Sequence, residues 1–252
     1  MSREYLNALW ELTKRELRRK YARSYLGILW SVFYPLLRMA LVVFLFSHIF
    51  NKGIDRYPAY YFTGYLMYEF FSVSVFTSVT TLRDNKDLLI KSKLPREMFV
   101  LSRVLTAFVN FLFGCIPYMG VLLVYRAEVS VATLFVLVDI FCMFLFVAGI
   151  AYMVSIFYVK VKDTKNIVQQ CTTILRFFVA MFYSKEWVSR GVQTFIEFNP
   201  PYVFIEIARD TVIYGIMPEI RYINQMIIYG VGFYVIGKMF FERNKDEVLA
   251  RL

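Results

Sequence analysis

Histidine and cysteine are both scarce, with one histidine and three cysteines among 252 residues. His48 lies near the far end of an apolar run without cysteine or carboxylate neighbours, which is not the pattern of a metal site. Cys115, Cys142 and Cys171 each lie inside apolar runs, without the paired spacing of a metal site or a disulfide framework. We therefore expect the cysteines to serve packing, and we expect no metal cofactor.

Catalytic motifs are missing as well. No G-x-S-x-G or H-E-x-x-H run occurs, and a single histidine excludes most histidine-based catalysis. Residues 232–238 match most of a phosphate-binding loop, but Met239 stands where the magnesium-binding serine or threonine belongs, and the run lies in an apolar stretch. We therefore expect no catalytic residues and no nucleotide hydrolysis by this chain itself.

Apolar residues dominate instead: 59% of the chain is hydrophobic, 19% is aromatic, and the mean hydropathy is +0.53. A helix that spans a bilayer needs about 20 mainly apolar residues. Six stretches are long enough, namely 30–50, 58–82, 99–125, 131–159, 166–183 and 223–241. The sequence thus predicts an all-α integral membrane protein with six transmembrane helices, forming one domain over 1–252 whose membrane part is 29–252 with a cytoplasmic tail.

The basic residues indicate orientation. The formal net charge is +10, and lysine and arginine concentrate before the first stretch, in the second-to-third and fourth-to-fifth connections, and in the tail. By the positive-inside rule, both chain ends lie in the cytoplasm. Because these residues flank apolar runs and are scattered, we expect no nucleic-acid partner.

The amino-terminal residues carry many charges and no uninterrupted apolar core, unlike a cleavable signal peptide. Leu6, Trp10, Thr13, Leu17 and Tyr21 recur at helical spacing, which predicts an amphipathic helix within residues 1–28, lying on the cytoplasmic leaflet. Two roles stay open for this helix, a lipid anchor and a docking element for a partner protein.

The second-to-third connection is the largest cytoplasmic one between spans. A short helix is expected to end before Pro95 and to consist of Asp84, Asn85, Lys86, Asp87, Leu88, Leu89, Ile90 and Lys91. Its three adjacent apolar residues favour contact with a protein surface over a merely solvated loop. On the opposite side, the apolar connection 184–222 predicts short helices that dip into the outer leaflet, broken at Asn199-Pro200-Pro201 and near Gly215.

Charges within the predicted spans mark a candidate pathway. Arg38, Glu69 and Arg176 lie at similar depths, where charges are costly and are functional candidates by default. Two interpretations stay open, a structural Arg38–Glu69 pair and a lining that meets an anionic or hydroxylated cargo. Arg103, nearer the cytoplasm, is expected to extend to the surface. Deep aromatic rings suit stacking against sugars, with core packing as the alternative: Tyr34, Tyr65, Tyr68, Phe71, Phe178 and Phe182.

Four motifs, taken in order, resemble those of type-two ATP-binding-cassette export permeases. They are Tyr25-Leu26-Gly27-Ile28-Leu29-Trp30 with Tyr34-Pro35-Leu36, Leu94-Pro95-Arg96-Glu97 with Ser102-Arg103-Val104, Val161-Lys162-Asp163, and Asn199-Pro200 with Arg209-Asp210. Many relatives have arginine where this chain has Lys162. The likeness covers nearly the whole chain and is strongest to the polysaccharide branch, whose members export lipid-linked O antigen, capsule or teichoic acid.

The resemblance implies a homodimeric permease in the bacterial inner membrane, surrounded by lipid and bound to two ATPase subunits that hold ATP and magnesium. It implies that the cargo is a lipid-linked polysaccharide, that the segment Asp84 to Lys91 is the coupling helix, and that spans one, two and five line the conduit. Leu26 and Gly27 would form the cytoplasmic mouth, and Asn199, Pro200 and Arg209 would belong to an outer gate.

Three rival functions are weighed beside this one. A related exporter of a lipid or hydrophobic drug would have a more aliphatic pathway. A membrane enzyme of glycan assembly would need catalytic carboxylates, for which Asp84 and Asp87 among many lysines are poor candidates. An autonomous channel or ion-coupled carrier would need internal repeats and broken midplane helices, and the sequence has no convincing repeat.

Overall fold

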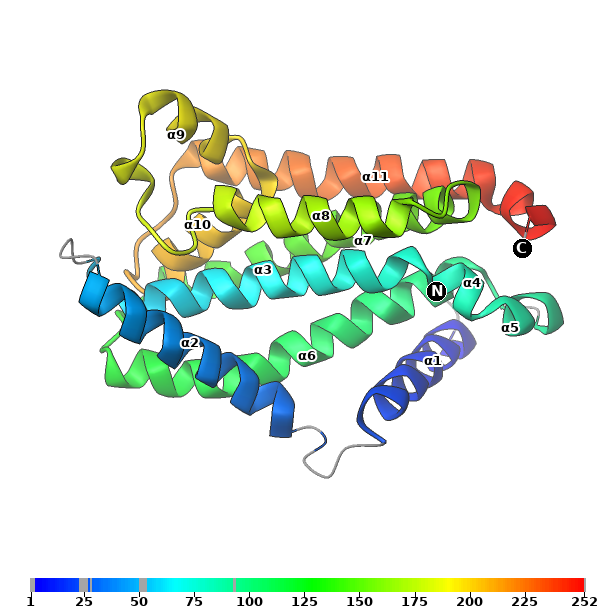
Figure 1. Ribbon diagram of the computed structural model, residues 1–252, viewed down its shortest axis with the longest axis horizontal. Helices are drawn as coiled ribbons and strands as arrows, with labels where there is room; N and C mark the ends of the chain where they lie inside the picture. Colours follow the sequence, from blue (N-terminus) through cyan, green and yellow to red (C-terminus); the bar gives the residue numbers. More distant parts are fainter. Residues whose placement is uncertain (1–2, 23–26, 28, 50–53, 93, 252) are drawn as a thin grey trace.

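The computed structural model describes residues 3–22, 27, 29–49, 54–92 and 94–251, and every regular element within these ranges is a helix. The long helices run side by side in an elongated bundle (Figure 1). The helices are α1 Arg3–Tyr21, α2 Leu29–Ile49, α3 Tyr57–Val79, α4 Thr81–Asp84, α5 Lys86–Lys91, α6 Glu97–Val124, η1 Val131–Phe135, α7 Val136–Lys160, α8 Thr164–Leu175, η2 Arg176–Phe178, η3 Lys185–Trp187, α9 Arg190–Glu197, α10 Pro200–Val212 and α11 Ile220–Arg251. The all-α prediction is confirmed.

Helices α2, α3, α6, α7, α8 and α11 lie over the six apolar stretches that the sequence singles out. Among the described residues, two helical segments are long and apolar enough to cross a bilayer by length and composition, Glu97–Val124 and Val131–Lys160. A shorter apolar helix covers Val32–Leu45. That all six helices cross the membrane therefore stays a prediction.

The fifth predicted span is not one continuous helix. After α8 the chain turns through η2, and Ala180 adopts a left-handed φ of 44°. The Asn199 side-chain amide donates to the carbonyl of Phe178 at 2.8 Å, and Arg209 donates to the carbonyl of Ala180 at 3.0 Å. These bonds from α10 satisfy carbonyls that a continuing helix would have bonded internally, so the helix ends early.

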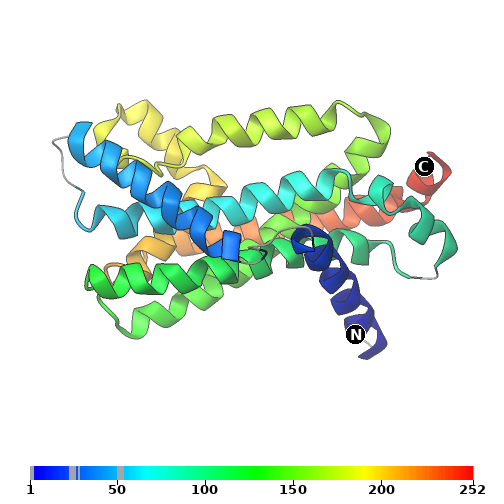
Figure 2. The ribbon, with the colours of Figure 1, turned by 60° about the horizontal axis from the view of Figure 1, so that its bottom comes forward.

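Both chain ends lie at the same end of the bundle as α4 and α5, whereas α9 lies at the opposite end (Figure 1, Figure 2). Near the α9 end, α10 inserts against α3, α7 and α11. Helix α9 ends at Glu197, and α10 begins at Pro200. Helix α10 ends at Val212, and Gly215 beyond it has a φ of 63°. The amino-terminal helix and the α4–α5 segment thus occupy one end, in agreement with the distribution of basic residues.

The most extensive helix contact joins α7 and α11, and it depends on glycine. A Cβ atom added to Gly149 would lie 2.1 Å from the carbonyl oxygen of Phe233, and one added to Gly237 would lie 2.1 Å from the carbonyl oxygen of Gly149. Small residues permit such close backbone approach between apolar helices. With α3, which is buried over most of its length, this pair forms the centre of the bundle.

Helix α1 packs against α6 with a face that overlaps the predicted stripe only at Thr13 and at Tyr21, which donates to Asn110 of α6. Leu6 and Trp10 of the predicted apolar stripe are about half exposed. The residues buried in the contact are Leu9, Leu12, Thr13 and Glu16. The stripe predicted from apolar spacing did not include most of this face, because the buried face contains a glutamate. The exposed Leu6 and Trp10 suit a helix that lies on lipid.

Candidate functional site

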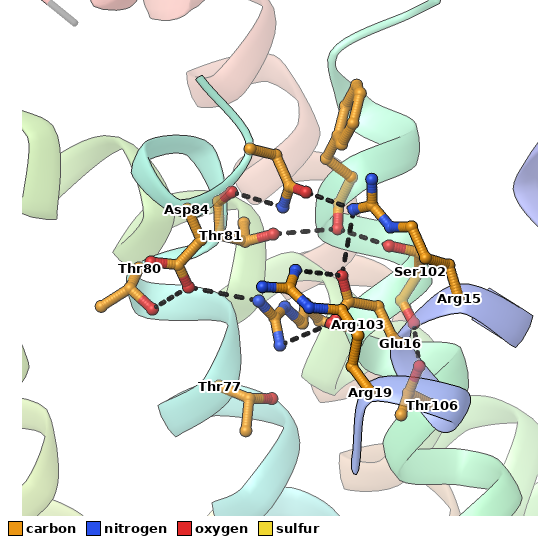
Figure 3. Close-up of polar contacts among 12 residues, drawn as sticks. Arg15, Glu16, Arg19, Thr77, Thr80, Thr81, Asp84, Ser102, Arg103 and Thr106 are labelled. Atoms are coloured by element: carbon orange, nitrogen blue, oxygen red, sulfur yellow. Dashed lines mark hydrogen bonds and ion pairs between the residues drawn. The ribbon is translucent and has the colours of Figure 1, made fainter. Parts of the chain in front are cut away.

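A buried carboxylate connects α1 to the predicted coupling segment. Glu16 is 5% exposed, and Arg103 of α6 lies 2.9 Å from it through Nη1. Through Nη2, Arg103 also lies 3.2 Å from Asp84, the last residue of α4 (Figure 3). Arg15 lies 3.1 Å from Glu16 and donates to the side chain of Asn85, which precedes α5. Helices α1, α4 and α6 are therefore held by one shared set of charges.

This network corrects one prediction and adds one residue. Arg103 does not simply extend to the surface, because its guanidinium is mostly buried between two carboxylates. Glu16 was absent from the sequence-based candidates. The available signal was its spacing, since Glu16 falls one helical turn after Leu12 and Thr13 on the packed face of α1.

The predicted coupling segment is not one helix: Asp84 ends α4, Asn85 follows it, and the short helix α5 runs from Lys86 to Lys91 and thus ends before Pro95. Leu89 is buried against the bundle, whereas Leu88 is 38% exposed and Ile90 is 56% exposed. Lys86, Asp87 and Lys91 are exposed beside them. The segment therefore presents apolar side chains ringed by charge at one end of the bundle, the composition of a protein contact surface.

The motif residues Arg96 and Glu97 tie this end to both chain termini. Tyr5 of α1 donates to Glu97 at 2.9 Å, and Lys238 of α11 lies 3.3 Å from the same carboxylate. Arg96 lies 2.6 Å from Asp246 near the end of α11. Burial, and then the hydrogen bond to Glu97, raise the pKa of Tyr5, so this phenol stays protonated and remains a donor.

Two charged side chains of the predicted pathway meet. Arg176 of η2 lies 3.9 Å from Glu69 of α3, and about a third of each side chain is exposed. The Arg38–Glu69 pair considered from the sequence is not among the ion pairs of the described residues. Arg38 instead donates to Tyr34 on its own helix and lies over the rings of Tyr34 and Tyr65 at 4.5 and 5.9 Å. Arginine over an aromatic face is stabilised by the ring quadrupole.

The six predicted pathway rings differ in exposure. Tyr65, Tyr68 and Phe71 of α3 are buried within the chain, where Phe71 stacks on Phe146 and Tyr68 donates to the carbonyl of Thr172. The remaining rings reach the surface to different degrees: Tyr34 and Phe178 are exposed, and Phe182 is partly exposed. The exposed rings of this cluster therefore lie on α2 and at the end of η2.

Helix α8 adds a polar surface beside that cluster. None of its residues is buried, and its exposed side chains include Gln169, Gln170 and Thr173 together with Ile167 and Ile174. This helix forms most of the predicted fifth span, where the bilayer would otherwise demand apolar side chains facing outward. Its polar surface is therefore suited to water, to a polar cargo or to another protein surface.

The predicted outer residues brace the bundle near α9. Arg209 is 1% exposed, lies over the ring of Tyr60 at 3.5 Å and pairs with Glu206 at 3.4 Å. Pro200 begins α10, directly after Asn199. A polar cavity of about 280 Å³ opens beside Arg209, lined in part by Lys185, Trp187, Tyr202, Glu206 and Asp210.

At the predicted cytoplasmic mouth, Leu26 lies outside the described residues. Gly27 has a φ of 40°, a left-handed conformation that favours glycine. The phosphate-loop look-alike at 232–238 lies inside the continuous helix α11. These residues form no strand followed by a loop that could hold a phosphate. The sequence argument against a phosphate-binding loop therefore agrees with the structure.

Comparison with known proteins defines the class. A family model described as ABC-2 type transporter matches residues 7–213, which is most of the chain. This chain belongs to that family, as its motifs predict. It is a membrane transport protein built from the helices described above.

Individual known proteins are also similar to the chain. The O-antigen export system permease protein RfbA of Myxococcus xanthus is 29% identical over 181 residues, covering 71% of this chain and 69% of that protein. Two proteins of the same name from Klebsiella pneumoniae are 23% and 24% identical over 235 residues, each covering 93% of this chain and 90% of the relative. The likeness thus extends over nearly the full length.

Proposed function

We propose that this chain is the transmembrane permease subunit of an ATP-driven exporter that moves a lipid-linked, O-antigen-like polysaccharide out of the cytoplasm across the bacterial inner membrane. Relatives named O-antigen export permeases align over nearly its whole length, which supports this cargo class. The structural observation that carries the proposal is the polar and aromatic surface formed by α8, the Glu69–Arg176 pair and Tyr34.

Lipid is a poor solvent for that surface. Exposed glutamine, threonine and charged side chains at membrane depth are costly unless they face a water-filled path or protein. Two copies of this chain, related by a twofold axis, would place these surfaces opposite each other and enclose such a path. We therefore propose a homodimer in which α2, α3 and α8 line the conduit.

A conduit for an extended glycan needs many weak contacts. Aromatic faces bind the CH faces of sugars, and arginine and glutamate side chains hydrogen-bond to hydroxyls, so no single site holds the chain tightly. Tyr34, Arg38, Glu69, Arg176 and Phe178 offer this mixture on the open surface. A lipid or drug exporter would be expected to present a more aliphatic surface there.

Energy for movement would come from two copies of a separate ATPase subunit. The exposed α5 helix supplies the contact, and the Glu16–Arg103–Asp84 network carries its movement to α1 and α6. This assignment places α5 and both chain ends on the cytoplasmic side. It leaves ATP and magnesium with the partner, in keeping with the helical setting of 232–238.

Genetic complementation tests the function. In a strain lacking this chain, surface polysaccharide should disappear while lipid-linked glycan accumulates inside the cell. Export should return only when this chain and a matching ATPase subunit are both expressed. A strain that fails to make the glycan at all would instead support an assembly enzyme. Normal export without the chain would refute the proposal.

A further inference from the structure

A cavity of about 390 Å³ lies where α2 crosses α3 and α6, close to the end of α1. This volume falls within the range of about 300–1,000 Å³ found for small-molecule sites. Its walls are mainly apolar and aromatic, formed chiefly by Trp30, Tyr34, Tyr65, Leu66, Phe70 and Phe111, and they also include the acidic residue Glu69. The volume of the cavity and its mainly apolar walls therefore suit a hydrocarbon chain.

A second, more polar hollow of about 410 Å³ adjoins it. The two share Lys20, Val73, Ala107 and Asn110 as wall residues. The polar hollow extends from this junction toward the network of Figure 3, past Arg19, Arg103 and Thr106. Together the two adjoining cavities form a cleft whose walls change from mainly apolar to charged, with Glu16, Arg19 and Arg103 on the charged side and Lys20 at the junction.

The charges of this cleft leave Lys20 without an ion-pair partner among the described residues. Glu16 is held by Arg103 at 2.9 Å and approached by Arg19 at 3.8 Å, and Glu69 is paired with Arg176. The recorded contact of the Lys20 ammonium is with the ring of Tyr21, at 5.3 Å. Burial lowers the pKa of Lys20, opposed by the more distant Glu69. An anion beside Lys20 would therefore stabilise its charged form.

We infer that this cleft binds an anionic glycerophospholipid, with one acyl chain in the aromatic cavity and the phosphodiester against Lys20. Basic pockets between membrane helices on the cytoplasmic side bind anionic headgroups in this way. A phosphodiester carries a single negative charge, which one unpaired lysine balances. A pyrophosphate-linked carrier would bring a second charge that the neighbouring arginines, already paired, do not meet. The inference rests on the proposed membrane setting of the chain, and its cavity shares Tyr34 and Glu69 with the surface proposed to line the conduit.

Tryptophan fluorescence tests the site directly. Trp30 lines the cavity, and replacing the other two tryptophans, Trp10 and Trp187, by phenylalanine leaves it as the sole indole. The full-length chain in nanodiscs is titrated with phosphatidylglycerol or phosphatidylcholine carrying brominated acyl chains, which quench indole on contact. Phosphatidylglycerol should bind about fivefold tighter, the effect of one lysine near a membrane surface.

Three variants in the same background decide the outcome. Lys20→Gln should abolish the preference, whereas Lys20→Arg should retain it. Lys14→Gln removes an identical charge from α1, but Lys14 is paired with Glu11 at 2.7 Å, so the preference should persist. Equal quenching by both lipids would overturn the inference, as would a preference that survives Lys20→Gln. Equal losses in Lys14→Gln and Lys20→Gln would show general surface attraction and would overturn it too.

Discussion

Arg103 of α6 bridges two carboxylates that belong to different parts of the chain, Glu16 of α1 at 2.9 Å and Asp84 of α4 at 3.2 Å. Neither carboxylate is close to Arg103 in sequence. Because the side chain of Glu16 is almost fully buried, movement of α4 cannot leave α1 undisturbed without breaking an ion pair in a poorly solvated site. The amino-terminal helix is therefore mechanically linked to the predicted coupling segment.

Replacing Glu16 by glutamine should uncouple this region. Removing one partner of a fully buried ion pair costs about 3–5 kcal/mol. Since Arg15 and Arg19 reach solvent, we expect a loss of about 1–2 kcal/mol here, and a clear drop in ATPase stimulation by the permease. Thermal unfolding in detergent and ATPase assays of the assembled complex measure both. Glu11→Gln, which breaks an exposed pair on the same helix, should change neither.

The α5 surface should be needed for assembly with the ATPase. Ile90→Asp places a charge on an exposed apolar residue, so the chain should fold normally but lose co-purification with the partner subunit. Val129→Asp places the same charge on a strongly exposed apolar residue elsewhere, in the connection between α6 and η1, and should leave assembly intact. Full assembly of the Ile90 variant would mean that the contact lies elsewhere.

The Glu69–Arg176 pair offers a test of structural against transport roles. Glu69→Gln and Arg176→Gln should each reduce glycan export while the amount of folded protein stays near normal, because both side chains are partly exposed. A purely structural pair would be restored by exchanging the two charges, Glu69→Arg with Arg176→Glu. We expect the exchanged variant to remain defective, since a glycan would meet each charge at the wrong place. Restored export would contradict a lining role.

The sequence predicts those features of the structure that local forces determine. Lengths of apolar helix are limited by the bilayer, so α2, α3, α6, α7 and α11 fall where hydropathy places long helices, whereas the fifth stretch contains the shorter helix α8. Proline and glycine act on the local backbone, so the breaks at Pro200 and Gly215 were also predictable. Pairing is different: Arg38 has its tyrosine partner on its own helix, and whether it also reaches Glu69 depends on tertiary placement.

The early end of α8 and the burial of Glu16 could not be predicted from the sequence, for the same reason. The carbonyls of Phe178 and Ala180 are satisfied by Asn199 and Arg209, which are distant in sequence. Glu16 is tolerated on a packed face only because Arg103 arrives from another helix. Patterns along one segment contain no information about such partners.

Asp210 should give the protein a pH-dependent stability. Burial, and then the charge of Glu206, raise the pKa of Asp210 to about 7, with Glu219 adding to the rise and Lys185 and Arg209 opposing it. A carboxyl group with a raised pKa holds its proton better when folded, so this contribution to stability is present at low pH and is lost as the pH rises from about 4 through 7.

The melting temperature should therefore fall between pH 5 and pH 8, by the equivalent of about 2 kcal/mol. Asp210→Asn should flatten this dependence. Asp55→Asn, at an exposed carboxylate, should leave the dependence as it is in the unmodified chain. An unchanged slope in Asp210→Asn would show that another group titrates.

The contact between α7 and α11 should tolerate no side chain at Gly237. A methyl group there would meet the backbone oxygen of Gly149 at 2.1 Å, and backbone cannot rotate aside as a side chain can. Overpacking of this kind costs about 1–3 kcal/mol or more. On the same helix, a methyl group at Gly232 meets nothing within 4 Å, so Gly232→Ala should be neutral or stabilise by up to about 1 kcal/mol through helix propensity. Thermal unfolding of the two single variants gives the comparison, and equal melting temperatures would show that the helices are free to separate.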